Sequence, residues 1–540
     1  MSYTAHIDAF VREHLPPPAT MPEFLFSLAE MRYPEQMNAA EYFVDRHVRA
    51  GSGARRCIVA PGGTAWSYGD VLERSNRIAR VLAEDFGVVP GNRVLLRAPN
   101  TPMLAACWLA VLKAGAIAVT TMPLYRASEL RQIIEKARVS LALCDVRLRD
   151  ELEQAIDGSA PRVAYFATLD EAGLEFRMQA KPAHFENVRT GAQDVAIIAF
   201  TSGTTGTPKA AMHFHRDLIA TCDTYGAHVL TPQPTDVFCG SPPLAFTFGL
   251  GGLLLFPLYT GACTAMIEKA GPQEMLNAIE EFGVTTIFTA PIAYRSMLAL
   301  MPEGRTGTLR TCISAGETLP KSVFDAWYER TGIQILDGIG STEMLHIFIG
   351  SPAGRARAGS TGEAVPGYMA EVHDEDGNRL PPGQVGRLAV KGPTGCKYLD
   401  DSRQCAYVVG GWNYPGDAYR CDADGYFYYV ARTDDMIVSA GFNVSGPEVE
   451  QAMVAHPHVK ECAVVAKPDP AHDTHIVKAY VVLTGGIDAD EAKRNELREH
   501  CKASIAPFKA PREIEFVLEL PRTETGKLQR YRLRQRALAE

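Results

Sequence analysis

The chain has 540 residues, 46% of them hydrophobic and 22% charged, and its formal net charge is −9 at pH 7. Because this length exceeds one ordinary hydrophobic core, two or more domains are expected. The composition indicates a soluble globular protein, and the acidic balance argues against a nucleic-acid partner.

No segment of the sequence indicates export or a membrane span. Residues 1–8 lack the basic and apolar stretches of a signal peptide, and the 12 cysteines show no CxxC spacing, so a cytoplasmic protein with reduced thiols is expected. The apolar window 103–122 has about the length of one membrane span. Lys113 and Gly115 divide it into a helix-like and a strand-like half, so we expect buried core there instead.

From about residue 54 onward, short β-rich runs alternate with helical patterns. The expected strands in this part are 93–97, 116–120, 141–145, 194–200, 285–290, 311–315 and 333–337. The expected helices are 103–112, 128–139 and 216–230. This alternation predicts an α/β fold of parallel sheets covered by helices, in which ligands bind beyond the carboxyl ends of the strands.

A loop rich in glycine and hydroxyl side chains follows the expected strand 194–200. It reads Thr201-Ser202-Gly203-Thr204-Thr205-Gly206-Thr207-Pro208-Lys209. The glycines let backbone N–H groups turn toward an anion, and the hydroxyls and the lysine add donors and positive charge, so the loop is predicted to bind phosphate. The spacing disfavours a P-loop ATPase, because Pro208 precedes the lysine and no Ser or Thr follows it. A flexible polar linker is the alternative.

Two more loops follow expected strands and carry residues suited to a nucleotide. Ser314-Ala315-Gly316-Glu317 places a glycine where the backbone could approach a flat base. Asp337-Gly338-Ile339-Gly340-Ser341-Thr342-Glu343 places a hydroxyl beside a carboxylate, and Mg²⁺ binds one or two carboxylates plus substrate phosphates. Taken alone, a glutamate in a glycine loop is also typical of a cap or a turn.

The character of the sequence changes past Gly362. Turn signals at 376–377, 381–383 and 424–425 separate short strands, which predicts a β subdomain at about 362–433. A compact α+β pattern follows, with helices from 448 and over 490–502, and strands near 459–466, 477–483 and 513–520. We therefore predict a large N-terminal domain, 1–433, and a small C-terminal domain, 434–540.

Together these loops resemble, in their order along the chain, the signature segments of the adenylate-forming superfamily, which includes acyl-CoA and aryl-CoA synthetases, luciferases and peptide-synthetase adenylation domains. Members activate a carboxylate with ATP to form an acyl adenylate, and they rotate the C-terminal domain between two half-reactions. The resemblance implies ATP, Mg²⁺ and coenzyme A as cofactors and co-substrates. It also implies helix-covered parallel sheets with a β subdomain and a small mobile α+β lid.

The resemblance assigns the nucleotide contacts residue by residue. The expected ATP- and AMP-binding residues are Thr201, Ser202, Gly203, Thr204, Thr205, Gly206, Lys209, Ala315, Gly316, Glu317, Asp337, Gly338, Asp417 and Arg432. Asp417 would accept hydrogen bonds from both ribose hydroxyls, which a carboxylate does well, and Arg432 would also reach the ribose. Thr342 would contact the α-phosphate, and Glu343 would hold Mg²⁺.

Three further positions belong to the expected C-terminal lid. Lys527 resembles the catalytic lysine, whose ammonium meets the charge that develops between the carboxylate and the α-phosphate. Asp434 occupies the hinge position of the family, and Gly441 matches the glycine that lines the pantetheine tunnel. The family often has two adjacent glycines there, whereas this chain has Ala440 first.

The segment 335–348 most resembles benzoate-type CoA ligases, and the N-terminal portion resembles their 2-aminobenzoate branch. Phe246 would be an aromatic gate, and the acyl pocket would be formed by Thr247, Phe248, Gly340 and His346. A flat apolar slot of this kind suits an aryl acid. Thr247 and His346 would hydrogen-bond an ortho amino group, or else they serve only the structure.

The resemblance therefore implies an AMP-forming aryl-CoA ligase for 2-aminobenzoate or benzoate, as in the degradation of aromatic compounds. Two related alternatives stay open. The chain could adenylate another acid, such as a medium-chain acid, or load a separate carrier protein. Luciferase-like oxidation also stays open, as a remoter option. From another class, a nucleotide- or acyl-binding protein without turnover is the alternative. The sequence leaves the oligomeric state undecided, with a homodimer as one option.

Overall fold

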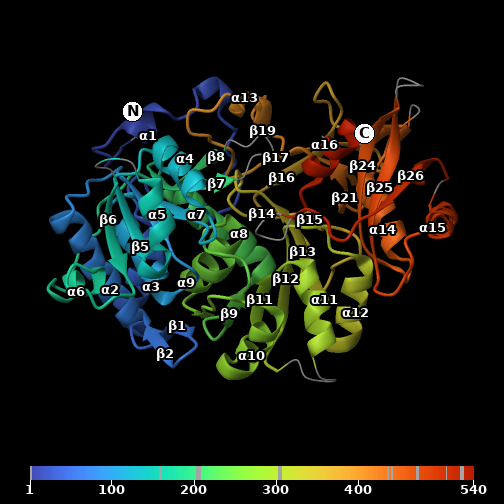
Figure 1. Cartoon of the computed structure of the whole chain (residues 1–540). Helices are drawn as coiled ribbons and strands as arrows, with labels where there is room; N and C mark the ends of the chain where they lie inside the picture. The colour runs from blue at the N-terminus through green and yellow to red at the C-terminus, as the bar shows by residue number, and fades with distance from the viewer. Residues whose placement is uncertain are drawn as a thin grey trace. The chain divides into compact units, whose positions relative to one another are not determined.

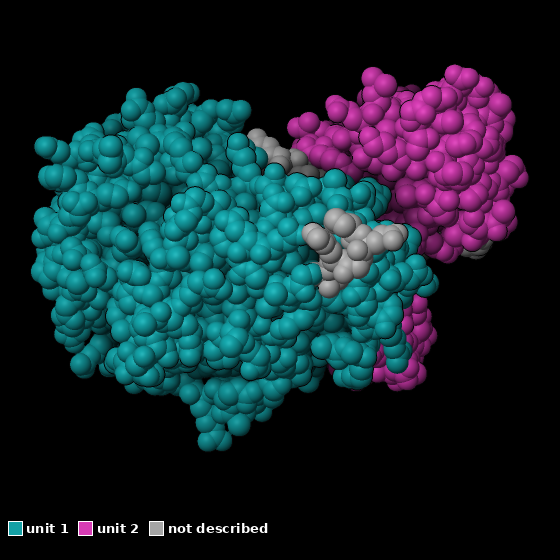
Figure 2. Space-filling view, turned by 90° about the horizontal axis from the view of Figure 1, so that it is seen from below, with its two compact units in different colours: residues 1–370, 390–413 teal, residues 371–389, 414–540 magenta. Residues whose placement is uncertain are grey.

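The computed structural model describes residues 3–156, 158, 161–201, 208–301, 307–433, 437–439, 442–469, 474–505, 507–522 and 528–540. The chain divides into two compact units (Figure 2). Unit 1 comprises Met1–Ala370 and Val390–Asn413, and unit 2 comprises Glu371–Ala389 and Tyr414–Glu540. The backbone therefore passes from one unit to the other after residues 370, 389 and 413.

Unit 1 contains a six-stranded sheet of order β6-β5-β3-β4-β7-β8 (Figure 1). Its strands are β3 Arg93–Arg97, β4 Ile117–Thr121, β5 Leu141–Asp145, β6 Arg162–Phe166, β7 Val195–Thr201 and β8 Lys209–Phe214. All neighbours are parallel except β7 and β8. The helices α3 (Pro102–Lys113) and α4 (Ala127–Ala137) connect parallel strands, and α4 buries Leu130 and Ile133 against the core.

A second sheet in unit 1 has nine strands in the order β15-β14-β13-β12-β11-β9-β10-β1-β2. Its strands are β1 Arg56–Ala60, β2 Thr64–Ser67, β9 Val237–Gly240, β10 Cys263–Ala265, β11 Thr286–Thr289, β12 Thr311–Ser314, β13 Ile335–Gly340, β14 Ile347–Gly350 and β15 Glu363–Ala364. The run from β13 to β1 is parallel, and both edges are antiparallel. Helices α10 (Pro272–Phe282), α11 (Pro291–Leu300) and α12 (Lys321–Thr331) bury apolar faces beside it, with Trp327 fully buried.

A further six-stranded sheet, formed by short strands from β16 (Met369–His373) to β21, contains the points at which the backbone changes unit. Its strand β17 (Val385–Lys391) begins in unit 2 and ends in unit 1. Within unit 2, β20 (Asp417–Cys421) and β21 (Phe427–Arg432) form an antiparallel pair. This part corresponds to the turn-rich β region of the sequence.

The rest of unit 2 is an α+β fold around one three-stranded sheet of order β24-β25-β26. Its elements are α14 Gly446–Val454, β24 Val459–Asp469, β25 Thr474–Leu483, α15 Glu491–Ser504, β26 Glu513–Phe516 and α16 Arg530–Ala539. Buried side chains such as Val449, Val464, Val481 and Leu497 form its core. Asp490 caps α15, because its carboxylate accepts the backbone N–H of Lys493 at 2.8 Å.

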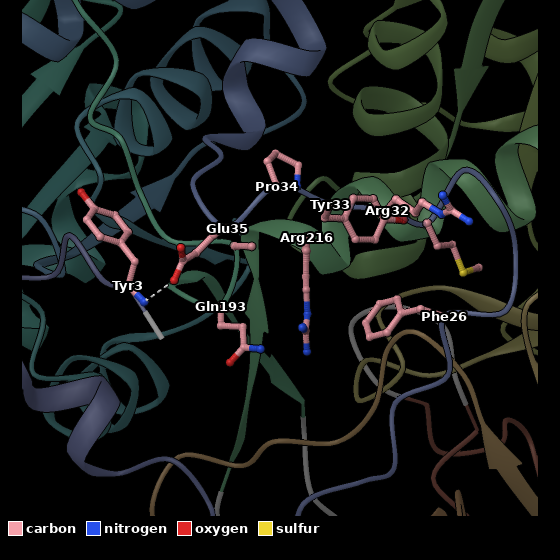
Figure 3. Close-up of a pocket in the computed structure, with 10 residues that line it drawn as sticks. Tyr3, Phe26, Arg32, Tyr33, Pro34, Glu35, Gln193 and Arg216 are labelled. Carbon is pink, nitrogen blue, oxygen red and sulfur yellow. Dashed lines mark hydrogen bonds between the residues drawn. The ribbon is translucent and has the colours of Figure 1, made fainter. Parts of the chain in front are cut away.

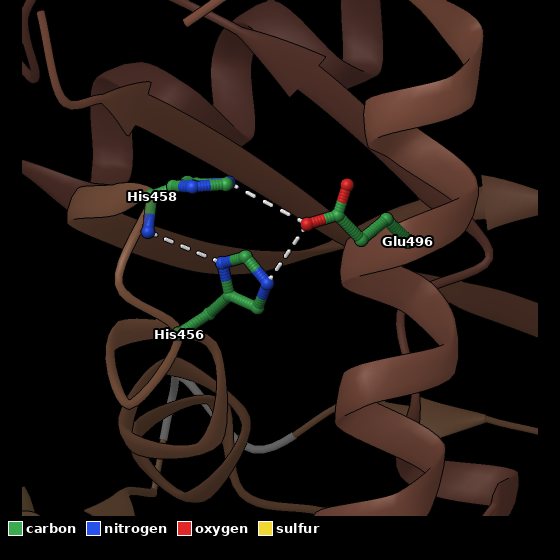
Figure 4. A group of neighbouring side chains, drawn as sticks. All are labelled: His456, His458 and Glu496. Carbon is green, nitrogen blue, oxygen red and sulfur yellow. Dashed lines mark hydrogen bonds and ion pairs between the residues drawn. The ribbon is translucent and has the colours of Figure 1, made fainter.

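Polar contacts tie the turn after α14 to helix α15 in unit 2 (Figure 4). Nε2 of His456 lies 3.1 Å from a carboxylate oxygen of Glu496, and Nδ1 of His458 lies 3.4 Å from the same oxygen. Nδ1 of His456 accepts the backbone N–H of His458 at 3.2 Å. Lys493 donates to Nδ1 of His458 at 2.9 Å, so a side-chain cation already occupies this cluster.

The predicted fold class is confirmed: helix-covered, mostly parallel sheets precede a smaller α+β region. The apolar window 103–122 is divided between α3 and β4 and is almost entirely buried. Within the described ranges, no helix is both long and apolar enough to cross a membrane. The domain boundary at residue 434, predicted from the change of sequence pattern, and the hinge at Asp434 stay predictions.

Candidate active site

The segment from β13 to β14 carries most of the expected site residues of unit 1. It holds Asp337, Gly338, Gly340, Thr342, Glu343 and His346. At Gly340 a Cβ would lie 2.6 Å from the carbonyl oxygen of His346, so a side chain would clash where the strand turns back. Burial raises the pKa of Asp337 well above its usual range, and the Oδ1 atom of Asp337 has no hydrogen-bond partner. Burial therefore favours the protonated form of this carboxyl group.

Two side chains from distant parts of unit 1 hold Thr342 and Glu343. His213, in β8, donates from Nε2 to the carbonyl oxygen of Thr342 at 2.8 Å. Burial lowers the pKa of His213 to about 3, so the ring is neutral and can act as this donor. Tyr398 donates its hydroxyl to Oε1 of Glu343 in a short hydrogen bond, and burial raises the pKa of Tyr398, so this proton stays in place.

The ends of the β7–β8 hairpin lie near the same carboxylate. Thr201 ends β7, Lys209 begins β8, and the two are paired in the antiparallel register. Nζ of Lys209 lies 5.4 Å from the centroid of the Tyr398 ring, a cation–π arrangement. Lys209 and Glu343 are thus linked through one tyrosine, as expected if both act at a phosphate.

The turn after β12 holds the residues expected at the adenine. Ser314 pairs with Asp337 in the parallel register, so the turn starts beside β13. Ala315 is buried, whereas Gly316 and Glu317 are exposed. Gly316 has φ +90°, a conformation that favours glycine.

His346 lies at the centre of a cluster of aromatic side chains. Its ring centroid is 4.7 Å from that of Phe256, 5.3 Å from Tyr225, 5.8 Å from Phe248 and 6.3 Å from Phe288. Neither ring nitrogen of His346 makes a hydrogen bond of good geometry to a described residue, although the Phe248 backbone lies close enough to favour the charged ring. Burial lowers the pKa of His346 to about 3, so the imidazole is neutral, with one donor and one acceptor nitrogen unused.

The expected gate segment leads into this cluster. Phe246 precedes helix α8 (Thr247–Leu250), Thr247 is buried, and Phe248 contacts the rings of His346 and Phe288. A Cβ on Gly251, one turn along, would lie 2.3 Å from the His346 ring. The structure therefore brings the expected pocket residues Thr247, Phe248 and His346 into one region.

Asp417 and Arg432 lie in unit 2, where β20 and β21 place them directly opposite each other. Nη1 of Arg432 donates to Oδ1 of Asp417 at 3.1 Å and to the carbonyl oxygen of Pro415 at 3.0 Å. Gly416 has φ +84°, and a Cβ there would lie 2.8 Å from Nη2 of Arg432. The two residues expected at the ribose therefore form one ion pair.

Several expected site residues lie outside the described residues. They are Ser202, Gly203, Thr204, Thr205, Gly206, Asp434, Gly441 and Lys527. Conversely, Tyr398 and His213 were not among the residues predicted for the site. The one available signal was polarity in a buried run, because His213 interrupts the apolar strand Ala210–Phe214.

Comparison with known proteins identifies the family of this chain. The model of the AMP-binding enzyme family matches residues 44–397, and that of the AMP-binding enzyme C-terminal domain matches 448–527. The chain belongs to the AMP-binding enzyme family. The predicted resemblance to adenylate-forming enzymes is thereby confirmed, with the family segments in the expected order.

Similar proteins of this family cover nearly the full length. Benzoate–CoA ligase of Thauera aromatica is 34% identical over 515 residues, which span 93% of this chain and 97% of the relative. An anthranilate CoA ligase solved with anthranoyl-AMP has a TM-score of 0.87 at 31% identity, covering 94% of this chain and 98% of that one. A benzoate CoA ligase of Burkholderia xenovorans has a TM-score of 0.84 at 31% identity, covering 92% and 100%. This AMP-binding enzyme is thus an AMP-forming acid–CoA ligase, as predicted.

Proposed function

We propose that this AMP-binding enzyme is an aryl-CoA ligase acting on 2-aminobenzoate or benzoate. The observation that carries the proposal is the buried aromatic cluster around His346, whose two ring nitrogens lack partners. Aromatic walls favour a flat acyl group, and an unpaired buried imidazole favours a ring substituent that can hydrogen-bond. The names of the similar proteins, benzoate and anthranilate CoA ligases, support the same class of acid.

The expected reaction has two steps. A carboxylate oxygen of the acid attacks the α-phosphorus of ATP, pyrophosphate leaves, and an acyl adenylate forms. The thiol sulfur of CoA then attacks the acyl carbon, AMP leaves, and the thiol proton passes to solvent. In the first step Thr342 would donate to the α-phosphate, and Lys527 would stabilise the charge between the two reacting groups.

Glu343 fits the role of a magnesium ligand. Tyr398 occupies Oε1, and no described residue bonds to Oε2, so one oxygen of an ordered carboxylate stays available to a cation. Mg²⁺ is usually held by one or two carboxylates together with substrate phosphates. When bound, the ion would offset the negative charge of the phosphates, while Tyr398 and His213 keep the loop in place.

Pyrophosphate release by the purified protein tests this function. ATP and CoA would be supplied with 2-aminobenzoate, benzoate, hydroxybenzoates or a medium-chain fatty acid, and the thioester identified by mass. We expect release and a thioester with the aryl acids. Faster turnover of the fatty acid would contradict the aryl assignment, and release without any thioester would favour a carrier-protein loader.

A further inference from the structure

A second cavity in unit 1 has no place in the proposed reaction. It has a volume of about 330 Å³ (Figure 3). Its lining residues are Tyr3, Phe26, Met31, Arg32, Tyr33, Pro34, Glu35, Ala192, Gln193 and Arg216. Four segments contribute to it: Tyr3 near the N-terminus, residues 26–35, the residues just before β7, and Arg216 after β8.

Arg216 is the unusual member of this lining. Its guanidinium lies 4.8 Å from the ring centroid of Phe26, 5.1 Å from Phe24 and 5.5 Å from Phe214. Its side chain is only 12% exposed, and its Nε is buried without a hydrogen-bond partner. Oδ1 of Asp217 lies 3.8 Å from this Nε, within ion-pair distance but beyond hydrogen-bond distance.

Asp217 is shared between two cations, and its Oδ1 makes no hydrogen bond to a described residue. Its Oδ2 accepts Nζ of the fully buried Lys397 at 2.9 Å. Burial lowers the pKa of Arg216, yet an arginine keeps its charge at any physiological pH. The cavity is thus lined by a charged guanidinium whose Nε–H has no acceptor among the described residues.

The remaining charges leave this cavity positive. Arg32 is exposed and has no ion-pair partner within the described part of the chain. The one carboxylate in the lining, Glu35, accepts the backbone N–H of Tyr3 at 3.1 Å through Oε1. Tyr33 donates its hydroxyl to Oδ2 of Asp223 at 2.9 Å and therefore presents mainly its ring. Two guanidinium groups against one carboxylate favour an anion, and the aromatic rings favour a flat apolar body beside it.

The walls are fixed by contacts of their own. Asp194, at the start of the hairpin, accepts the backbone N–H of Ala5 at 2.9 Å and that of Gly191 at 2.8 Å. At Gly191 a Cβ would lie 2.4 Å from the carbonyl oxygen of Tyr3, so the two backbones are in close contact. A cavity whose walls are already ordered loses less conformational entropy when a ligand binds.

This cavity is distinct from the predicted phosphate loop. Gln193 precedes β7 and Arg216 follows β8, whereas residues 202–207 connect the opposite ends of the same two strands. At about 3.3 Å per residue, the length of β7 separates the two ends by roughly 20 Å. The cavity is therefore a separate position from the expected nucleotide site.

We propose that this cavity is a second binding site for a small aromatic carboxylate. The carboxylate would accept hydrogen bonds from the guanidinium of Arg216, which Figure 3 shows between Gln193 and Phe26, and the ring would lie against Phe26 and Tyr33. No group is transferred there. The site holds an acid molecule that is not undergoing activation, so its occupancy follows the concentration of free acid.

Equilibrium dialysis with labelled benzoate tests the site on the full-length protein. Two variants are compared with the wild type: Arg216→Gln, which removes the charge, and Gln193→Glu, which adds a repelling charge at an exposed position. Gln154→Glu, an exposed site elsewhere in unit 1, is the control for the charge change. If Arg216→Gln prevents folding because the residue is buried, the exposed Gln193→Glu variant still tests whether benzoate binds in the cavity.

We expect both cavity variants to bind one benzoate fewer per chain than the wild type, or to bind it at least about tenfold more weakly at that site, as the loss of a charge-assisted hydrogen bond implies. The loss of one bound benzoate is expected whether or not the acyl pocket also binds benzoate. The dialysis result therefore does not depend on whether the proposed aryl-CoA ligase reaction takes place. Equal binding by all four proteins would overturn the proposal. Acetate should bind more weakly than benzoate, and displacement of benzoate by equimolar inorganic phosphate would show a plain anion site instead.

Discussion

At the scale of single residues, the hydroxyl of Tyr398 decides how Glu343 is presented. It donates to Oε1 and leaves Oε2 without a described partner. Because one hydrogen bond to a charged group contributes about 1.5–3 kcal/mol, Tyr398→Phe is expected to raise the half-saturating Mg²⁺ concentration of pyrophosphate release about tenfold or more. Binding of Mn²⁺ in the presence of ATP, followed by electron paramagnetic resonance, should weaken in parallel.

Tyr407→Phe is the matched control for this effect. The hydroxyl of Tyr407 is hydrogen-bonded to that of Ser341 at 3.1 Å, so the variant alters the same loop while keeping the Tyr398 hydroxyl that bonds to Glu343. If both variants raise the half-saturating Mg²⁺ concentration equally, packing of the loop determines Mg²⁺ binding, and not the orientation of Glu343.

His346 carries the prediction on acid selectivity. Replacing it by leucine removes both unpaired nitrogens and costs no described hydrogen bond. If these nitrogens pair with an ortho amino group, His346→Leu should lower the ratio of kcat/KM for 2-aminobenzoate over benzoate by at least about tenfold, since a site built for a hydrogen-bonding group loses discrimination when that partner is removed. An unchanged ratio would make this histidine purely structural.

At the scale of elements, much of the structure follows from local sequence pattern. The expected strand 93–97 and helix 103–112 agree with β3 and α3 within one or two residues. The site is harder to predict, because its supporting residues come from far apart: His213 and Tyr398 both reach the loop at 342–343. Helical periodicity also missed the widened turns after α7 (His215–Thr221), where residues 222–230 form a π-helix that brings Gly226 against Phe256.

The cap of α15 gives a prediction at this scale. Asp490→Ala removes the acceptor for the Lys493 N–H and should destabilise unit 2 by about 1 kcal/mol. Hydrogen exchange of the first-turn amides of α15 in the full-length protein should accelerate accordingly. The exposed Asp488, two residues earlier, is the control, and Asp488→Ala is expected to leave the exchange rates as they are.

At the scale of the whole molecule, three buried neutral histidines make stability depend on pH. Burial lowers the pKa values of His213, His215 and His346 to about 3 each, whereas an unfolded chain has histidine pKa values of about 6.5. Below about pH 6.5 the unfolded state therefore binds more protons than the folded state, so stability is present above this pH and is lost as the pH falls.

Each such histidine should remove about 1.4 kcal/mol of stability per pH unit between pH 6 and 4. Urea denaturation at several pH values measures this slope. His346→Leu should make the slope shallower by about one such contribution. If the unfolding free energy of His346→Leu depends on pH as steeply as that of the wild type, His346 is protonated in the folded protein.

The backbone passes three times between the two units, and this affects the order in which they can fold during synthesis. Synthesis starts at the N-terminus, so residues 371–389 leave the ribosome before 390–413, although they belong with the later unit. Gly386 can pair with Tyr419 only after the segment 390–413 has been added, whereas Val390 pairs with Asn413 as soon as that residue emerges. Unit 1 can thus close first, while the start of β17, which pairs with the earlier strand β16 on one side, waits with its other edge open. For the time it takes to synthesise some thirty residues, about two to six seconds at bacterial to eukaryotic rates, the nascent enzyme exposes a strand edge that a chaperone would have to shield.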